Sequence, residues 1–412
     1  MTTKKDIESA LMRGADTLRD TIDAANYKDY VLPVMFVKYL SDSYTDAVEE
    51  LSKQYSGIRL ERQKKYLPFM VAEGCSFYDL YQQRFADNIG QLMNAAMRQI
   101  EADNNQQLAG VLSAVDYNSE NALGTREHKN AILRDLLEDF EPLDLRPSAI
   151  EVKEGQVPAD VIGDAYEYMI GQFASMAGKK AGSFYTPAAV SEIMARIVDV
   201  QPGERVYDPT CGSGSLLIKA AKKQNSKEVS IYGQEVNGSS VAMAKMNMYI
   251  HEIRDAKIGW GDTLANPVFL DADGNLLLFD AIVANMPFSK DKWASGFNPG
   301  GESSGKGKKE FKMEASLDKF HRFDWGVPPA SKGDWAFLLH MIASLSVNGR
   351  IAAVAPRTVP WRGRGQNPPA GGRRKSAGYC DRPPGELVLW YVHPGVHPCV
   401  QKEPSYHGCP VH

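Results

Sequence analysis

Two hydrophobic patterns divide the chain. Up to about residue 155 the apolar positions recur at steps of three and four, as at Ile7, Leu11, Ala15, Leu18 and Ile22, which is typical of an amphipathic helix. The segment YVLPVMFVKYLSD is apolar nearly all round, which predicts a helix buried among its neighbours. We therefore predict an all-helical N-terminal domain over residues 1–155. Its default interpretation is a scaffold, with DNA clamping or subunit binding as the alternatives.

From about residue 156 short β-branched runs alternate with helix-period segments. They are RVYDPTCGSGSLLIKAAKK, VSIYGQEVNGSSVAMAKMNMYIHE, AKIGWGDTLAN, LFDAIVANMPFS and GDWAFLLHMIASLSVNGRIAAVAP, preceded by a helix expected to start at Pro187. Strands that alternate with helices favour a parallel sheet covered on both faces. The fold class predicted for residues 156–356 is therefore α/β, with a doubly wound, mostly parallel, Rossmann-like sheet.

Composition narrows the function classes. At 412 residues and 43% hydrophobic content the chain can bury a large core, and its net charge of -4 gives no overall attraction to nucleic acid. Any DNA-facing surface is therefore a local patch. We find no apolar run of transmembrane length and no signal peptide, which predicts a cytoplasmic protein with no membrane partner. Only Cys75 and Cys211 precede residue 380, which fits a reducing compartment.

Polar residues mark the ends of three successive predicted strands. Asp208 precedes a Gly-x-Gly at Gly212 and Gly214, a pattern that by itself is equally typical of a tight turn into a helix. Glu235 ends SIYGQE, and Asp262 follows in GWGDTL. Both acids could simply cap helices. Together with the glycine turn they fit a nucleoside with a cationic group and no pyrophosphate, which S-adenosylmethionine provides.

The fourth strand ends in DAIVANMPFS. Asn285 offers a side-chain oxygen and Met286 a main-chain carbonyl, which could together accept both hydrogens of an amine. Pro287 would fix the turn, and Phe288 offers a flat face on which a planar base could stack. Orientation and electrostatic stabilisation then suffice for a transfer to that amine, so no metal is expected.

These motifs carry a family resemblance. YDPTCGSGSLL with a downstream N-x-P-F resembles the amino-methyltransferases that act on adenine in DNA. More narrowly, IESALMRGADTLRDTIDAANYKDYVLPVMFVKYLSD, GDAYEYMIGQFA, AGSFYTP and GDWAFLLHMI resemble the methylation (modification) subunit of type I restriction-modification systems, over residues 1 to about 356. The resemblance implies methyl transfer from S-adenosylmethionine to adenine. It also implies a second methylation subunit, a specificity subunit that reads the sequence, and a restriction subunit in the full complex.

The resemblance also implies roles for individual residues. Those implied at the cofactor are Phe184, Tyr185, Thr186 and Pro187 in a closing loop, Asp208, Thr210, Gly212, Ser213 and Gly214 at the methionine end, Glu235 at the ribose and Asp262 near the adenine. Those implied at a target adenine flipped out of double-stranded DNA are Asn285, Met286, Pro287 and Phe288. The family usually has proline where this chain has Met286. We expect the change to be tolerated, because a backbone carbonyl is what the position supplies.

Two other functions remain open from the residues alone. An RNA or protein amide methyltransferase would use the same Asn turn, and a truncated subunit could hold the cofactor without turnover. The long segment 290–332 could bring Lys306, Lys308 and Lys309 to DNA phosphates, or it could be a solvated loop.

The last segment, residues 357–412, lacks periodicity and is crowded with Pro, Gly, Arg, Cys and His. Zinc binding would need paired ligands, and the segment has no CxxC pair. A disordered tail is the simpler interpretation. The hypothesis that fits better is a shifted reading frame, because Gly385 to Lys402 read one base later can encode a strand region like that of the family. The chain would then lack the last strands of the sheet and the family's C-terminal helices.

Overall fold

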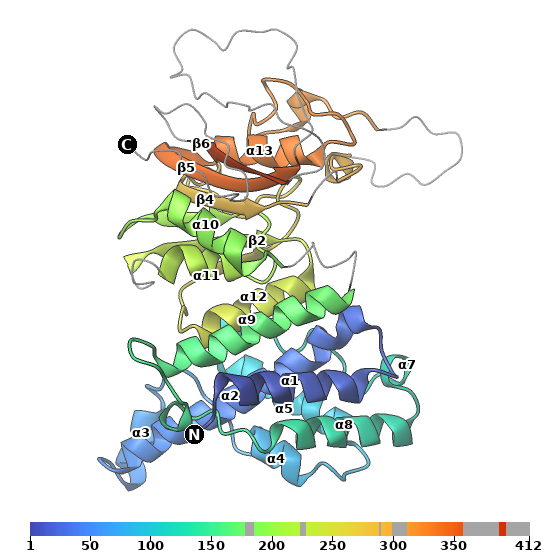
Figure 1. Cartoon of the computed structure of the whole chain (residues 1–412), viewed down its shortest axis with the longest axis vertical. Helices are drawn as coiled ribbons and strands as arrows, with labels where there is room; N and C mark the ends of the chain where they lie inside the picture. Colours follow the sequence, from blue (N-terminus) through green and yellow to red (C-terminus); the bar gives the residue numbers. More distant parts are fainter. Residues whose placement is uncertain (178–184, 223–227, 288–289, 299–310, 357–386, 393–412) are drawn as a thin grey trace, which may run out of the picture. The chain divides into compact units, whose positions relative to one another are not determined.

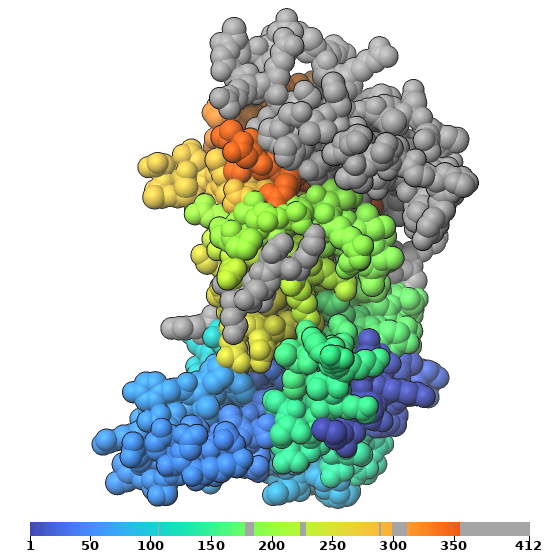
Figure 2. All heavy atoms as spheres, turned by 60° about the vertical axis from the view of Figure 1, so that its left-hand side comes forward, coloured from blue at the N-terminus to red at the C-terminus, as the bar shows by residue number. Residues whose placement is uncertain are grey.

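Two compact units make up the structure. The computed structural model describes residues 1–177, 185–222, 228–287, 290–298, 311–356 and 387–392, and the remaining residues are grey in Figures 1 and 2. One unit holds residues 1–185 and 238–254, and the other holds 186–237 and 255–412. In the part of the chain that is described, no helix has the length and apolar character needed to cross a bilayer.

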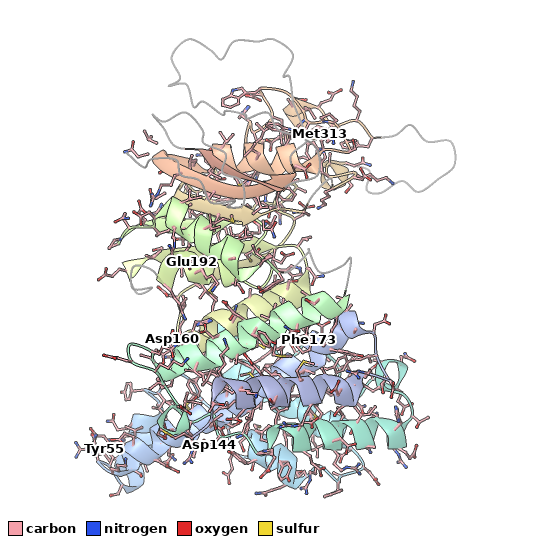
Figure 3. All side chains as sticks on the ribbon, in the orientation of Figure 1. Tyr55, Asp144, Asp160, Phe173, Glu192 and Met313 are labelled. Carbon is pink, nitrogen blue, oxygen red and sulfur yellow. The ribbon has the colours of Figure 1, made fainter. Side chains whose placement is uncertain are left out.

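The first unit is helical. Its elements are α1 (Lys4–Leu18), η1 (Ala24–Asn26), α2 (Tyr27–Ser52), α3 (Gly57–Lys64), α4 (Phe77–Gln82), α5 (Ile89–Asp103), α6 (Asn105–Leu108), α7 (Glu120–Leu123), α8 (Arg126–Phe140), η2 (Pro147–Ala149), α9 (Pro158–Ala177) and α12 (Gly238–Ile250). The predicted domain boundary at residue 155 stays a prediction, and the helical unit of this division also contains α9 and α12. The apolar faces of α9 and α12 are buried in the helical core, including Phe173, which Figure 3 labels, and Met246.

Helix α1 confirms the predicted amphipathic stripe. Its four positions Ile7, Leu11, Ala15 and Leu18 are buried. Thr3 caps the amino end, because its hydroxyl accepts a hydrogen bond from the Asp6 backbone N–H while the Asp6 carboxylate accepts one from the Thr3 N–H. The helix ends at Leu18, so Ile22 packs against the core from the turn that follows.

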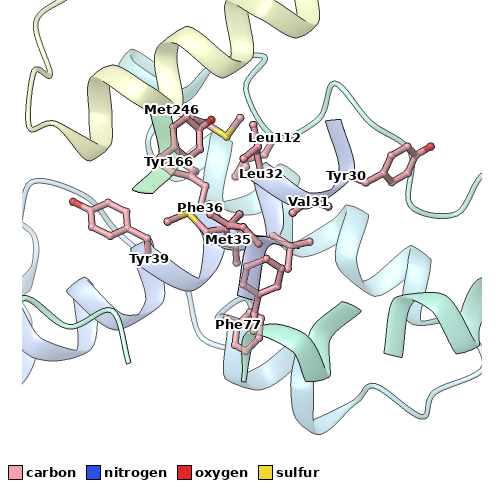
Figure 4. Close-up of a cluster of buried hydrophobic side chains, with 14 of the residues drawn as sticks. Tyr30, Val31, Leu32, Met35, Phe36, Tyr39, Phe77, Leu112, Tyr166 and Met246 are labelled. Atoms are coloured by element: carbon pink, nitrogen blue, oxygen red, sulfur yellow. The ribbon is translucent and has the colours of Figure 1, made fainter. Parts of the chain in front are cut away.

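Helix α2 forms the centre of the helical core. Every residue from Tyr30 to Ser43 is buried, which confirms the prediction for YVLPVMFVKYLSD. Figure 4 shows Met35 and Phe36 in the same cluster as Tyr166 of α9 and Met246 of α12. The Phe36 ring also meets Tyr249 of α12 edge to face, with 5.6 Å between the ring centres.

One ion pair lies inside this core. Lys38 and Asp42 are one helical turn apart on α2, with 2.6 Å between Nζ and Oδ2, and neither side chain is exposed. Asp42 also accepts hydrogen bonds from the Tyr78 hydroxyl at 2.7 Å and from the Leu145 N–H at 2.7 Å. Burial lowers the pKa of Lys38, and the Asp42 charge opposes that shift. The pair therefore joins α2 to two distant segments.

Removing one member of this pair should be costly. We expect Asp42→Ala to lower the free energy of unfolding by about 3–5 kcal/mol, because it leaves the Lys38 ammonium buried without its counter-charge. The matched control is Glu50→Ala on the same helix, where the partner Lys53 is exposed and no measurable loss is expected. Urea unfolding of the two variants makes the comparison. Equal losses would show that the buried pair does not hold the helices together.

The second unit is a six-stranded sheet with helices. Its elements are α10 (Ala188–Val198), β1 (Arg205–Asp208), α11 (Ser215–Lys222), β2 (Ser230–Glu235), β3 (Lys257–Trp260), β4 (Phe279–Asn285), η5 (Ser295–Phe297), η6 (Ala315–Leu317), α13 (Gly333–Ala343), β5 (Leu345–Pro356) and β6 (Leu387–Val392). The strand order is β3-β2-β1-β4-β5-β6. Strands β1 to β5 pair in parallel, and β6 pairs antiparallel to β5. This confirms the predicted doubly wound, mostly parallel sheet.

Side chains alternate between the two faces of the sheet. Tyr207, Ile282 and Ile351 share a buried cluster with Phe337 of α13. On the other face α10 and α11 pack against each other and against the strands (Figure 1). Pro187 is the N-cap of α10, so the helix begins one residue later than predicted.

The segment that follows β4 is packed where it is described. Trp293 and Phe323 are almost fully buried, with 5.1 Å between their ring centres, and Met313, labelled in Figure 3, joins the same cluster. This differs from a solvated loop, because these aromatic side chains cover part of the sheet's hydrophobic core. Lys306, Lys308 and Lys309 lie outside the described residues.

The last segment contributes one described strand. Residues Leu387–Val392 pair with Ile351–Pro356 along the edge of the sheet. These residues supply β-ladder partners to β5. Whether the chain lacks later strands of the sheet, as a shifted reading frame would imply, stays a prediction. The other residues of 357–412 lie outside the description, so the disordered-tail, zinc and frameshift interpretations stay hypotheses.

Candidate active site at the carboxyl ends of the strands

Strand register brings the predicted site residues to one edge of the sheet. Asp208 of β1 pairs with Gly233 of β2, and Glu235 pairs with Trp260 of β3. The order of connection reverses between β1 and β4, and Asn285 ends β4. Open α/β sheets bind ligands at such a reversal point. Asp208 and Glu235 therefore lie on the side of the reversal point that holds β1, β2 and β3, and Asn285 lies on the other side.

The turn after β1 is built on two glycines and a buried acid. Gly212 and Gly214 have φ of 51° and 76°, which side chains with a Cβ rarely adopt. Asp208 is 2% exposed, and its Oδ1 accepts hydrogen bonds from the Thr210 N–H at 2.8 Å and hydroxyl at 3.4 Å. Burial raises the pKa of the Asp208 carboxyl to about 8. A buried carboxyl held at such a turn is typical of a ligand site.

Glu235 is tied to the same turn. Its Oε2 accepts a hydrogen bond from the Gly212 N–H at 3.1 Å, and its Oε1 accepts one from the Asn237 N–H at 2.9 Å. Burial raises the pKa of Glu235, while these backbone donors lower it. A carboxylate has about four acceptor positions, so each oxygen can still accept from a ligand hydroxyl. The contact orients Glu235 before any ligand binds.

Asp262 lies two residues beyond the end of β3. Its Oδ1 accepts hydrogen bonds from the backbone N–H groups of Leu264 at 2.9 Å and Ala265 at 3.2 Å. These bonds close a turn at residues 262–265, where the structure describes no helix, so they are not the helix cap that the sequence left as an alternative. The second carboxylate oxygen, Oδ2, takes no part in these two bonds. Thr263 then donates from its hydroxyl to the Pro209 carbonyl at 2.6 Å, which joins this loop to the turn after β1.

Two buried polar side chains that were not predicted from the sequence, Arg322 and Gln234, hold this loop. The Arg322 guanidinium is 4% exposed and donates to the carbonyls of Thr263 at 3.2 Å and Leu264 at 2.5 Å, while Asp318 pairs with it. Gln234, fully buried in β2, donates to the carbonyl of Asn266 at 2.9 Å. Gln234 could have been predicted from the sequence, because it is a polar residue within an apolar strand. Arg322 could not, because it comes from a distant segment and no local pattern marks it.

Two exposed apolar side chains beside Glu235, Val236 and Trp260, were not predicted as site residues. Val236 follows Glu235 and is 55% exposed, and Trp260 is 70% exposed with its indole N–H donating to the Val236 carbonyl at 3.0 Å. An exposed aromatic ring fixed beside a strand-end acid offers a flat surface for a planar base. The signal was a tryptophan between the glycines of GWG at the end of a strand.

Asn285 meets the loop that precedes α10. Its Nδ2 donates a hydrogen bond to the Thr186 hydroxyl at 3.1 Å. Tyr185 instead belongs to the helical unit, where its ring packs over Gly171 of α9. Phe184 and Phe288 lie outside the described residues, and Pro187 caps α10. Among the described residues no cluster of His, Cys, Asp or Glu could hold a metal ion.

Comparison with known proteins gives the class that this fold and site define. A family model described as N-6 DNA Methylase matches residues 157–367, and one described as the HsdM N-terminal domain matches residues 7–140. The chain belongs to the N-6 DNA methylase family, as a type I restriction-modification methyltransferase subunit. The first match runs past the predicted boundary at residue 356.

Individual relatives give the same class. The chain is 29% identical over 342 residues to the type I restriction enzyme MjaVIII methylase subunit of Methanocaldococcus jannaschii, covering 80% of this chain and 53% of the relative. It is 29% identical over 388 residues to the MpnII methylase subunit of Mycoplasma pneumoniae, covering 84% of this chain and 67% of the relative. The chain thus spans about half to two thirds of these relatives.

Solved structures agree with the fold. The type I restriction-modification methyltransferase subunit from Streptococcus thermophilus is 30% identical, with a TM-score of 0.67 over 86% of this chain and 75% of that one. A modification subunit of a putative type I restriction enzyme from Vibrio vulnificus has a TM-score of 0.54 at 20% identity, over 87% of this chain and 72% of that one. The second likeness shows the fold alone.

Proposed function

We propose that this chain transfers a methyl group from S-adenosylmethionine to the exocyclic amine of adenine in DNA, as the modification subunit of a type I restriction-modification system. The observation that carries the proposal is the register of the sheet. It places a buried Asp208 and Glu235 on one side of the strand reversal and an amide at Asn285 on the other. A methyl donor and an acceptor amine can then meet above β1 and β4.

The residues present fit the cofactor. S-adenosylmethionine supplies a methyl group on a positively charged sulfur. The ionised Asp208 carboxylate would bind the cationic methionine end, and the turn at Gly212 and Gly214 lets the backbone approach it. Glu235 would accept the ribose hydroxyl hydrogens, and the Trp260 indole would lie against the adenine ring with Asp262 beside it.

Asn285 would act on the target amine. Its Nδ2 donates to Thr186, so its Oδ1 faces away from that bond and can accept a hydrogen from the adenine amine. The backbone carbonyl of Met286 would accept the other hydrogen, which directs the nitrogen lone pair at the methyl donor and stabilises the developing positive charge. The adenine must leave the duplex to reach this position.

The assembly is part of the proposal. The chain would work with a second copy and a specificity subunit that reads the DNA sequence, and a restriction subunit would join the full complex. A structure of similar fold, with a TM-score of 0.55 at 18% identity over 87% of this chain and 65% of that one, was solved to explain how a type I restriction-modification complex assembles.

The test is labelled methyl transfer with the cognate specificity subunit and duplex DNA. Digestion of the product to nucleosides should recover the label as N6-methyladenine. Label in RNA, in protein or in cytosine would contradict the proposal. Cofactor binding without transfer to any acceptor would favour the alternative of an inactive cofactor-binding subunit.

Met286 gives a separate prediction, because its side chain is 2% exposed and packs in the core of the sheet unit. We expect Met286→Pro to preserve or raise the methylation rate, since proline keeps the backbone carbonyl and restricts φ. Loss of buried side-chain contacts should lower the free energy of unfolding by about 1–3 kcal/mol. Met286→Leu, which keeps the side-chain volume, is the control for stability. A clear loss of rate in folded Met286→Pro would show that this turn does not hold the target.

A further inference from the structure

Thr186 and Asn285 are 99 residues apart in sequence and joined by one hydrogen bond. The Asn285 Nδ2 donates to the Thr186 Oγ1 at 3.1 Å, and both residues are partly buried. Asn285 ends β4, and Thr186 immediately precedes the N-cap of α10. The contact therefore joins the strand that carries the amide to the helix layer on one face of the sheet.

The orientation of this amide decides what it can bind. An asparagine side chain has an acceptor oxygen on one side and two donor hydrogens on the other. A target amine donates hydrogens, so of the two ends of the Asn285 amide only Oδ1 can accept from it. In a reversed amide the Nδ2 hydrogens would face the hydrogens of the amine, and no hydrogen bond would form. The torsion that reverses an amide is broad and has low barriers, so a neighbouring group must hold it.

Thr186 is well placed to be that group. Its β-branched side chain has few rotamers, and the proline that follows restricts its backbone. The carbonyl of Pro187 accepts hydrogen bonds from the N–H groups of Val190 at 2.9 Å and Ser191 at 3.0 Å, which anchors the loop to the first turn of α10. The hydroxyl thus projects from a fixed point and accepts from the Asn285 Nδ2, which leaves Oδ1 on the opposite side of the amide.

We propose that Thr186 is a positioning residue for methyl transfer, whose hydroxyl holds the Asn285 amide with Oδ1 toward the target amine. This inference rests on the proposed function and assigns Thr186 to the target side of the site. The family resemblance instead implied a role for Thr186 in a loop over the cofactor. A role over the cofactor predicts weaker cofactor binding when the hydroxyl is removed, whereas the positioning role predicts no change. One set of variants therefore separates the two roles.

The experiment compares Thr186→Val, which keeps the shape without the hydroxyl, with Thr186→Ser, which keeps the hydroxyl. Single-turnover methyl transfer is measured with the specificity subunit, cognate duplex and saturating cofactor. Thr186→Val should be about tenfold slower, the change expected for losing one neutral hydrogen bond, and Thr186→Ser should restore most of the rate. The cofactor affinity of both variants should equal that of the unaltered protein.

Repeating the Thr186 substitution in an Asn285→Asp variant tests whether Thr186 acts through the orientation of the Asn285 amide. In Asn285→Asp the two carboxylate oxygens are equivalent, so no reversed orientation exists. Adding Thr186→Val to Asn285→Asp should then lower the transfer rate only slightly. The effect of Thr186→Val would therefore depend on Asn285, which a double-mutant cycle reports as strong coupling between the two positions. Additive losses in the cycle, or a serine variant as slow as the valine variant, would overturn the inference. Weaker cofactor binding in Thr186→Val with an unchanged saturated rate would also overturn it.

A spectroscopic readout makes the test independent of turnover. In protein labelled with ¹⁵N-asparagine, the Asn285 side-chain amide signal is identified by its loss in Asn285→Asp. It should shift in Thr186→Val and return towards its original position in Thr186→Ser. An unmoved signal would overturn the inference. If the unaltered protein transfers no methyl group to DNA, the proposed function fails, and the amide signal alone then decides whether Thr186 orients Asn285.

Discussion

Asn285→Ala should reduce methyl transfer to DNA by about 10²–10³-fold, the range found when a group that stabilises developing charge is removed. The alanine variant loses the Oδ1 acceptor but leaves β4 and its register with β5 unchanged, since Asn285 pairs with Val354 through the backbone. Cofactor affinity should therefore stay the same. Single-turnover transfer of labelled methyl groups and calorimetric cofactor titration measure the two effects separately.

The control for this prediction is Asn285→Asp. The carboxylate keeps an acceptor at the same distance from the backbone, so this variant should retain more activity than alanine. Full activity in Asn285→Ala would mean that the target amine binds elsewhere. Loss of cofactor binding in either variant would place Asn285 on the cofactor side of the strand reversal instead.

Asp208→Asn should weaken cofactor binding and at the same time stabilise the cofactor-free protein. The carboxyl is buried with a pKa of about 8, far above the 3.8 of an exposed aspartate. The folded protein therefore holds a proton that the unfolded chain has released, and the resulting cost in stability grows from about pH 4 to pH 8. Asparagine keeps the acceptor for Thr210 and removes this cost.

The expected gain in the free energy of unfolding is about 1–3 kcal/mol near pH 8 and smaller at pH 5, after allowing for the buried amide hydrogens. Thermal unfolding at both pH values measures it. Cofactor affinity should fall about 10–100-fold, as for the loss of a charged hydrogen bond. At pH 7 the unaltered protein should release close to one proton from Asp208 on binding, measured by calorimetry in two buffers, and the variant should release none from this site. A variant less stable at pH 8 would contradict the raised pKa.

Local pattern was enough to predict most elements of the fold. The stripe of α1, the buried run of α2 and the alternation of strands and helices depend only on which neighbouring positions are apolar. The same holds for Asp208, Glu235 and Asn285, because a polar residue at the end of an apolar strand is visible in the sequence and parallel strands end at one edge. Their roles are still predictions that the proposed variants test.

Only the tertiary structure decided which residues far apart in the sequence are in contact. The helix α12 is apolar on most sides, so its sequence does not say which core it joins, and packing assigns it to the helical unit. Asp42 accepts a hydrogen bond from the Leu145 N–H, and Arg322 donates to the carbonyls that follow Asp262. Thr186 accepts a hydrogen bond from the Asn285 side chain. Side-chain periodicity determines the face of an element but leaves the partner on that face open. These contacts depend on how elements 58 to 103 residues apart are packed.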